Sequence, residues 1–439
     1  MGCLILFTLV FRSTWAPMKN APGQLVNDVA QYYSYLPAAF IEKDLSFKFP
    51  NEYWLIKNQN GIRLPKVTMG MSYMYAPFFF MGHGVAFVTN HKADGYSMPY
   101  YEAIATGSMI YVFLGLFLLY HCLKVHFDNL VSIASIIVVY LGTNLFYYTG
   151  NFGAMPHGHL FFLFSLILYL SIKFYSNPKP KTLYWLAFFA GLIAIIRPTS
   201  VLFLIVPLAY GVYSLKTLKE RLSLINDFKI SLLKSVFIFI IPIIPQLLYW
   251  KIYGGSWLFW SYGEEGFFFN NPHLSEFLFG FRKGWFVYTP IMIFSILGVF
   301  FLKKRAKEFM FIVPFLLIIT IFLFSSWWCW WFGGGFGARA LIQYYVVFIF
   351  PIAALLQYAF SKSKVWKMTF LAIYGLGISY NVLLTHKFNI NDIHWDAMTK
   401  EAFSHAFSKF HLTAEDREFQ KTLLKHPDYD KARMGLPED

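Results

Sequence analysis

The stretch FMFIVPFLLIITIFLFSS at residues 309–326 contains no charged side chain and is long enough to cross a bilayer as one helix. A basic stretch, KKRAKE at 303–308, precedes it. Nine more apolar runs of near-bilayer length occur along the chain, at 103–123, 130–149, 159–176, 182–196, 199–215, 235–252, 285–302, 340–360 and 367–386. The sequence therefore predicts an all-α polytopic membrane protein.

The composition agrees with this prediction. Of the 439 residues, 57% are hydrophobic and only 14% are charged, which lies outside the range of soluble globular domains. The formal charge of +14 would also fit a nucleic-acid-binding protein, but basic residues placed at one end of membrane spans explain it better, and we expect no nucleic-acid partner. Cys3, Cys122 and Cys329 lie in or beside different apolar segments, so neither a disulfide framework nor a cysteine metal site is expected.

Two further apolar segments need separate interpretations. Residues 1–11 are short for a crossing, and we interpret them as a tilted or N-terminally shortened first span, which brings the total to about eleven. A cleaved signal peptide is less consistent with this segment, since no basic region precedes it and no small-residue cleavage site follows. Residues 69–90 contain a proline, a histidine and glycines, and we expect a juxtamembrane or re-entrant element there.

The loops between the spans predict the orientation, because lysine and arginine are retained on the cytoplasmic side. Five alternate loops hold 16 basic and 4 acidic residues, at 121–129, 173–181, 216–234, 303–308 and 362–367. The other internal loops hold 4 basic and 3 acidic residues, at 149–158, 196–199, 253–283 and 327–340. The first set is therefore predicted to be cytoplasmic, and the second set to lie outside with the first loop (12–102) and the tail (387–439).

The outer face carries the candidate chemistry, because long loops on one side of a rigid scaffold are where sites are built. Asp28, in the sequence NDVAQYYSYL at 27–36, is the first carboxylate of the chain. One interpretation is a helix N-cap, in which Asn27 or Asp28 satisfies free backbone amides. The other is a general base that removes a proton from an attacking hydroxyl.

Histidines and cations are the next candidates. His157 and His159 precede a span; they could bind a metal, but no third ligand is obvious, and hydrogen-bonded interfacial histidines are the simpler interpretation. Arg197 lies between two spans and either reaches the outer headgroups or has an anionic partner. If Arg197 converged with three other cations at outer span ends, the group would suit a phosphate or diphosphate; these are Arg282, Lys283 and Arg339.

The last candidate for the outer face is an aromatic and glycine-rich stretch, WWCWWFGGGFGAR at 327–339. It is either an aromatic belt that ends in a flexible loop or the wall of a sugar or isoprenoid site, where glycines allow close backbone approach. We expect the substrate cavity to be lined by Tyr32, Tyr33, His157, His159, Trp330 and Trp331.

These motifs and their order resemble the GT-C superfamily of polyprenyl-phosphate-sugar glycosyltransferases, in particular protein O-mannosyltransferases and the lipid A aminoarabinose transferase. The resemblance covers most of residues 1–386, which we treat as the transmembrane domain. It rests on NDVAQYYSYL, a proline-containing stretch at 64–84, MPHGHLFF, GLIAIIRPTS, FGFRKGWFVYTP and WWCWWFGGGFGARAL.

The resemblance implies an inverting transfer on the periplasmic side of a bacterial inner membrane, from a polyprenyl-phosphate-linked sugar to a lipid, glycan or protein hydroxyl. Asp28 would be the base, His157 falls where relatives often have a histidine, and phosphate ligands by analogy would be Arg197, Arg282 and Arg339. Relatives often have two acidic residues where this chain has Asn27 and Asp28, so a role for a divalent metal stays open.

Two non-enzymatic alternatives remain at this point. A transporter of lipid-linked glycans predicts polar residues at mid-membrane depth and often an internal repeat, and neither stands out in the sequence. A binding scaffold that holds a lipid-linked glycan without turnover would share the cavity. The tail with NDIHWD at 391–396 lies outside the family pattern, and we expect it to pack over the outer cleft, mainly in a structural role.

Overall fold

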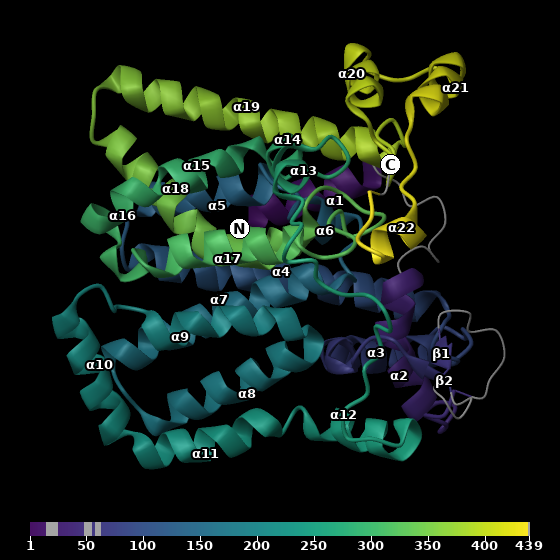
Figure 1. Cartoon of the computed structure of the whole chain (residues 1–439), viewed down its shortest axis with the longest axis horizontal. Coiled ribbons are helices and arrows are strands. Elements are labelled where there is room, and N and C mark those ends of the chain that lie inside the picture. Colours follow the sequence, from purple (N-terminus) through teal and green to yellow (C-terminus); the bar gives the residue numbers. More distant parts are fainter. Residues whose placement is uncertain (15–24, 48–54, 58–62, 438–439) are drawn as a thin grey trace. The chain divides into compact units, whose positions relative to one another are not determined.

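The computed structural model describes residues 1–14, 25–47, 55–57 and 63–437. Most of these residues are helical, so the all-α class is confirmed (Figure 1). A small antiparallel hairpin pairs β1 (Leu55–Lys57) with β2 (Arg63–Pro65). The chain divides into two compact units: unit 1 combines Met1–Pro17, Leu119–Asn151 and Glu264–Asp439, and unit 2 combines Met18–Leu118 and Phe152–Gly263.

Unit 2 contains the hairpin, most of α4 (Met98–Lys124), and the following helices: α2 (Asn27–Phe40), α3 (Gly70–Val88), α7 (Pro156–Ser176), α8 (Pro180–Ile196), η2 (Pro198–Leu204), α9 (Ile205–Ala209), α10 (Leu215–Asp227), α11 (Lys229–Ile240), α12 (Ile244–Tyr249) and the π-helical turn η3 (Trp250–Gly254).

Unit 1 contains α1 (Gly2–Thr14), α5 (Asn129–Leu141), α6 (Tyr147–Gly150), α13 (Leu274–Phe279), α14 (Trp285–Tyr288), η4 (Pro290–Met292), α15 (Ile293–Leu297), α16 (Val299–Arg305), η5 (Lys307–Phe309), α17 (Ile312–Ser325), η6 (Arg339–Tyr344), α18 (Tyr345–Phe360), α19 (Lys364–Asn389), α20 (Lys400–Ser408), α21 (Ala414–Leu423) and α22 (Tyr429–Arg433).

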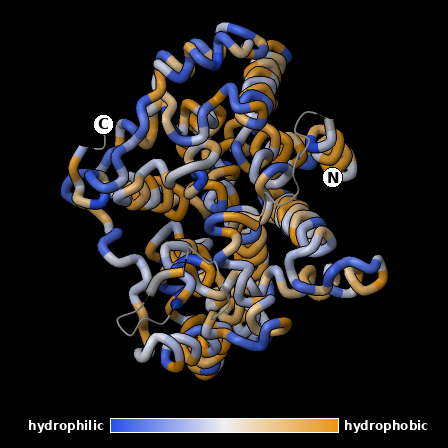
Figure 2. Tube along the Cα trace, turned by 90° about the vertical axis from the view of Figure 1, so that its right-hand side faces the viewer, coloured by the Kyte–Doolittle hydropathy of each residue, from blue (hydrophilic) through white to orange (hydrophobic). Residues whose placement is uncertain are grey.

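Five helical stretches of the described chain are long and apolar enough to cross a membrane: Met98–Lys124, Pro156–Ser176, Lys307–Ser325, Arg339–Phe360 and Lys364–Asn389. A sixth results if α11 and the helix after it, bent by 45° at their junction, form one span. Hydrophobic residues dominate most of the helices (Figure 2). The chain is thus an all-α protein with helices suited to a membrane, while eleven crossings and their orientation stay predictions.

Two neighbouring helices of unit 1 show how the apolar spans are used. α18 is apolar on all sides, and nearly all of its residues are buried inside the unit. α19 packs against α18 yet presents large apolar side chains outward, with Val365 73% and Leu376 72% exposed. Such a surface is unfavourable in water and suits contact with lipid chains.

In unit 2, α8 packs against α11 at a glycine. A Cβ at Gly191 would lie inside van der Waals contact with the carbonyl oxygen of Phe239 and 2.8 Å from Cγ of Pro242. Close backbone approach at small residues is a main source of helix association in membranes, where the hydrophobic effect between helices is absent. The glycine therefore sets the distance between these two helices.

We expect Gly191→Ala to destabilise unit 2 by about 1–3 kcal/mol or more, because the added methyl group overpacks a backbone contact. Gly375→Ala is the matched control, since a Cβ at Gly375 in α19 meets nothing within 4 Å. There the higher helix propensity of alanine predicts an unchanged or raised stability. Thermal unfolding of both variants in detergent micelles measures the difference, and equal melting of the two would contradict the packing argument.

Candidate functional site

Asp28 lies in the first turn of α2, in unit 2. The N-cap of this helix is Val26, whose side chain makes no capping hydrogen bond, so neither Asn27 nor Asp28 is the N-cap residue and that interpretation was wrong. Asn27 has φ +52°, a left-handed conformation that asparagine adopts more readily than most residues. A carboxylate in a first turn is favoured by the helix dipole.

Arg197 lies at the junction of α8 and η2, where Pro198 follows it. Because a residue before proline avoids the helical region, Arg197 is extended (φ −150°, ψ 115°) and α8 ends there. Burial lowers the pKa of this guanidinium, but Tyr32, Tyr262 and Asp28 outweigh burial and raise it, and Tyr32 also accepts a hydrogen bond. Of these three groups, only the Asp28 carboxylate is an anionic partner for Arg197, and the Tyr32 phenol is a neutral hydrogen-bond acceptor.

The strands and loops around this group are tied together by polar contacts. The amide of Lys66 donates to Oε1 of Gln31 in α2 (3.1 Å), and the Lys66 ammonium lies 5.0 Å from the ring centre of Tyr262. Ser261 donates to the carbonyl of Lys66 (2.5 Å). Tyr262 therefore reaches the neighbourhood of Arg197 on a loop held by the chain after β2.

The aromatic residues of α2 point into the body of unit 2. Tyr32 is 3% exposed and Tyr33 is fully buried, and the Tyr33 hydroxyl donates to the carbonyl of Gly95 (2.5 Å). Ser72 in α3 donates to the carbonyl of Tyr32 (2.5 Å). Tyr33 is therefore a packing residue in this structure, whereas Tyr32 shares the surroundings of Arg197.

Both histidines of α7 are buried. The Nδ1 atom of His159 lies 3.2 Å from the carbonyl of Met155, and its Nε2 atom lies 3.4 Å from the hydroxyl of Ser108. This agrees with the hydrogen-bonded interpretation of His159. His157 lies at the start of the same helix, which begins at Pro156. The described residues contain no group of three or more histidines, cysteines or carboxylates that could hold a metal ion.

The other three cations meet in unit 1, around Lys283. Lys283 is 2% exposed, and its Nζ donates to the carbonyls of Gly335 and Trp395, the latter at 2.5 Å. Burial lowers the pKa of Lys283 to about 7; the carboxylate of Asp396 opposes this effect, and the guanidinium groups of Arg339 and Arg282 add to it. Arg197 belongs to unit 2, and the convergence of all four cations stays a prediction.

Carbonyl groups and rings position the two arginines. Arg282 donates to the carbonyl of Lys425 (3.3 Å) and lies 5.1 Å from the ring centre of Trp331. Arg339 donates to the carbonyl of Phe332 (2.6 Å). Trp330 and Trp331 are 3% and 1% exposed, so the tryptophans are mostly enclosed by the unit itself.

The C-terminal tail contributes to this cluster, as part of unit 1. The Tyr429 hydroxyl donates to the Asp396 carboxylate (2.9 Å), and the Tyr429 ring lies 5.5 Å from that of Trp331. A Cβ at Gly334 would lie 2.6 Å from the Trp395 ring. The absence of a side chain at Gly334 therefore lets Trp395 of the tail pack closely against the glycine-rich stretch.

Sequence reasoning had singled out Asp28 and Arg197 separately, and the structure brings them together; it also brings together Arg282, Lys283 and Arg339. The sequence reasoning missed Tyr262 and Tyr429, because single tyrosines in irregular or charged segments carry no spacing signal. Asp396 was noted only within the NDIHWD motif.

The lowered pKa of Lys283 predicts a pH dependence of stability. Between about pH 7 and its ordinary pKa of 10.5, Lys283 is neutral in the folded chain but protonated in the unfolded chain. The unfolded state then binds more protons, so stability rises with pH over this window, by up to about 1.4 kcal/mol per pH unit, and this contribution is lost as the pH falls to 7.

Thermal unfolding in detergent between pH 6.5 and 10 tests this expectation. Lys283→Met should remove the rise that Lys283 causes, whereas the exposed Lys400→Met should retain it. Parallel curves for wild type and Lys283→Met would show that Lys283 is charged in both states.

No protein-family model matches this sequence, and no curated protein sequence matches it either.

Proposed function

We propose that the chain is a membrane glycosyltransferase that moves a sugar from a polyprenyl-phosphate carrier to an acceptor hydroxyl, with inversion at the anomeric carbon. The observation that carries the proposal is that, within unit 2, the Arg197 guanidinium has a hydrogen bond to the Tyr32 phenol and lies within electrostatic range of the Asp28 carboxylate. An inverting transfer needs a base for the acceptor and a cation for the leaving phosphate. Asp28 is a carboxylate suited to the first role, and Arg197 is a cation suited to the second.

The chemistry assigns one step to each group. Asp28 takes the proton of the acceptor hydroxyl as its oxygen forms a bond to the anomeric carbon. The bond from that carbon to the phosphate oxygen breaks, and the phosphate leaves with the electron pair. Arg197, with two fixed donors in a planar fork, stabilises the charge that develops on the phosphate. The Tyr32 phenol accepts a hydrogen bond from Arg197.

Unit 1 supplies a second cationic group that supports the proposal. Lys283, Arg282 and Arg339 act on one another electrostatically, with Asp396 as an opposing carboxylate. Buried positive charge of this kind is costly and is common where anionic ligands bind. We propose that Arg282, Lys283 and Arg339 contact phosphate as a group of unit 1 in its own right, on the periplasmic side of a bacterial inner membrane.

The test is transfer by the purified full chain in proteoliposomes, with synthetic polyprenyl-phosphate sugars as donors and a bacterial membrane extract as acceptor. Release of polyprenyl phosphate together with a sugar-labelled acceptor of opposite anomeric configuration supports the proposal. Donor binding without release would identify a binding scaffold, and donor movement across the bilayer without cleavage would identify a transporter. Both results would overturn the proposal.

A further inference from the structure

α10 is an amphipathic helix of unit 2 that has no buried residue. Ser214 caps it, and Thr217 completes a reciprocal capping box, so the helix is defined by its own sequence. Four large apolar side chains are exposed, namely Leu215 at 80%, Leu218 at 41%, Leu222 at 57% and Ile225 at 44%. Their spacing of three and four residues places them on one face.

A second face of α10 holds the helix against the unit. Arg221 donates to the carbonyls of Leu208 (3.2 Å) and Tyr210 at the end of α9, and its guanidinium lies 3.4 Å from the ring centre of Tyr175 in α7. Arg221 follows Leu218 by three residues and precedes Leu222 by one, so it borders the apolar face without covering it. α10 is thus fixed in place while that face stays open.

The direction of α10 fits a membrane surface. It connects α9 to α11 and runs crosswise at their ends (Figure 1). α11 begins at Lys229, directly after α10, and its apolar side chains are exposed along its length, including Leu233 at 63% and Phe237 at 67%. Because α11 is part of a candidate span, a helix lying across its end lies in the plane of the bilayer surface.

The charges of this segment fit anionic headgroups. Residues 214–234 contain five basic and two acidic residues, and Lys216 and Lys219 extend from α10 itself. A lysine side chain can reach a headgroup while its stem covers apolar surface. Basic residues beside an inserted apolar face are typical of helices that bind the interface of anionic membranes.

We propose that α10 lies in the headgroup region of the cytoplasmic leaflet, with Leu215, Leu218, Leu222 and Ile225 inserted toward the acyl chains and Lys216 and Lys219 on anionic phospholipid. This surface is independent of the transfer reaction. It anchors the ends of α9 and α11 at a fixed depth, and its affinity rises with the anionic lipid content of the leaflet.

Two variants with a cysteine introduced at adjacent positions test the inserted face. Leu222→Cys and Ser223→Cys point to different faces of α10, and both are made in a Cys3→Ser background, which keeps the buried Cys122 and Cys329. The full chain in inside-out membrane vesicles is treated with a charged, membrane-impermeant maleimide. We expect Leu222→Cys to react at least about tenfold more slowly than Ser223→Cys, and the difference to disappear in detergent.

Three results would overturn the proposal. Equal, fast labelling of both cysteines in membranes would place α10 in water, and protection of Leu222→Cys that persists in detergent would mean that protein covers this face. Labelling of Ser223→Cys in intact cells but not in inside-out vesicles would place α10 on the outer leaflet.

Lipid composition tests the charged face. In proteoliposomes of phosphatidylcholine with phosphatidylglycerol, replacing Lys216 and Lys219 by glutamine should speed the labelling of Leu222→Cys, whereas in phosphatidylcholine alone it should not. Equal labelling rates in both lipid mixtures would overturn the assignment of the lysines to anionic headgroups.

Discussion

Sugar transfer by an Asp28→Asn variant is expected to be about 10²–10⁴-fold slower than wild type, because asparagine cannot accept the proton of the acceptor hydroxyl. The variant keeps the size of the side chain and its place in the first turn of α2. It removes the negative charge beside Arg197, so donor binding should be retained while turnover is lost. Initial rates at saturating donor, with donor affinity measured separately, distinguish the two effects.

Asp94→Asn is the matched control for this variant. Asp94 lies in the same predicted outside loop and in the same unit, and its carboxylate accepts from the amides of Tyr96 (2.8 Å) and Ser97 (2.9 Å). Asparagine can accept both hydrogen bonds, so transfer should stay at the wild-type rate. If Asp28→Asn retained transfer, the general base would have to be another carboxylate, such as Glu264 or Glu265.

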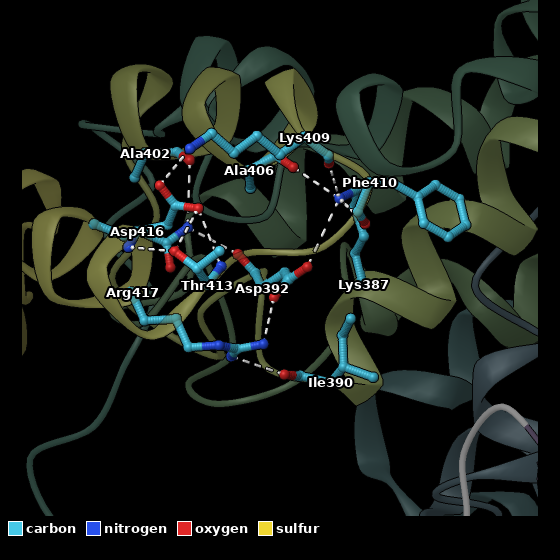
Figure 3. Close-up of polar contacts among 11 residues, drawn as sticks. Lys387, Ile390, Asp392, Ala402, Ala406, Lys409, Phe410, Thr413, Asp416 and Arg417 are labelled. Carbon is cyan, nitrogen blue, oxygen red and sulfur yellow. Dashed lines mark hydrogen bonds and ion pairs between the residues drawn. The ribbon is translucent and has the colours of Figure 1, made fainter.

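Loss of the Asp392 charge is expected to destabilise the C-terminal tail by about 3–5 kcal/mol, because it leaves two cations without their buried partner. Asp392 is fully buried after α19, 2.6 Å from Nη2 of Arg417 and 3.7 Å from Nζ of Lys387 (Figure 3). The Lys387 ammonium also donates to three carbonyls at the end of α20, those of Ala406, Lys409 and Phe410. Asp392 therefore joins α19 to α21, and its partner Lys387 joins α19 to the end of α20.

Hydrogen exchange of Asp392→Asn in detergent should show faster exchange across residues 387–437 than in wild type. Asp430→Asn is the control, because its ion pair with Arg433 is on the surface and 82% of the Asp430 side chain is exposed. Unchanged exchange in Asp392→Asn would mean that hydrogen bonds to carbonyls hold the tail without the ion pairs. A double variant, Asp392→Leu with Arg417→Met, should recover part of the loss.

The sequence predicted the positions of the helices better than their continuity. The runs at 309–326 and 340–360 correspond to α17 and to η6 with α18, because nothing inside them stops a helix other than a tolerated proline. The run at 235–252 is broken between Ile240 and Ile244, where Pro242 removes a backbone donor. Hydropathy averages over a proline such as Pro242, so counting apolar runs missed this break.

The candidate site could be predicted only as separate residues. Asp28 and Arg197 are far apart in sequence, and nothing in their spacing shows that α2 lies beside the end of α8. α3 packs against both α2 and α8, and a Cβ at Gly70, the first residue of α3, would lie 2.6 Å from the backbone of Ile195 in α8. The part of Asp396 in the Lys283 cluster was unpredictable for the same reason, since it depends on how the tail folds back within unit 1.

The order of the two units along the chain has a consequence for biosynthesis. Unit 2 ends at Gly263, whereas unit 1 needs Met1–Pro17, Leu119–Asn151 and everything from Glu264 onward. All of unit 2 has therefore left the ribosome while the early pieces of unit 1 still lack most of their partners. Since domains generally fold as their residues are completed during synthesis, we expect unit 2 to assemble before unit 1.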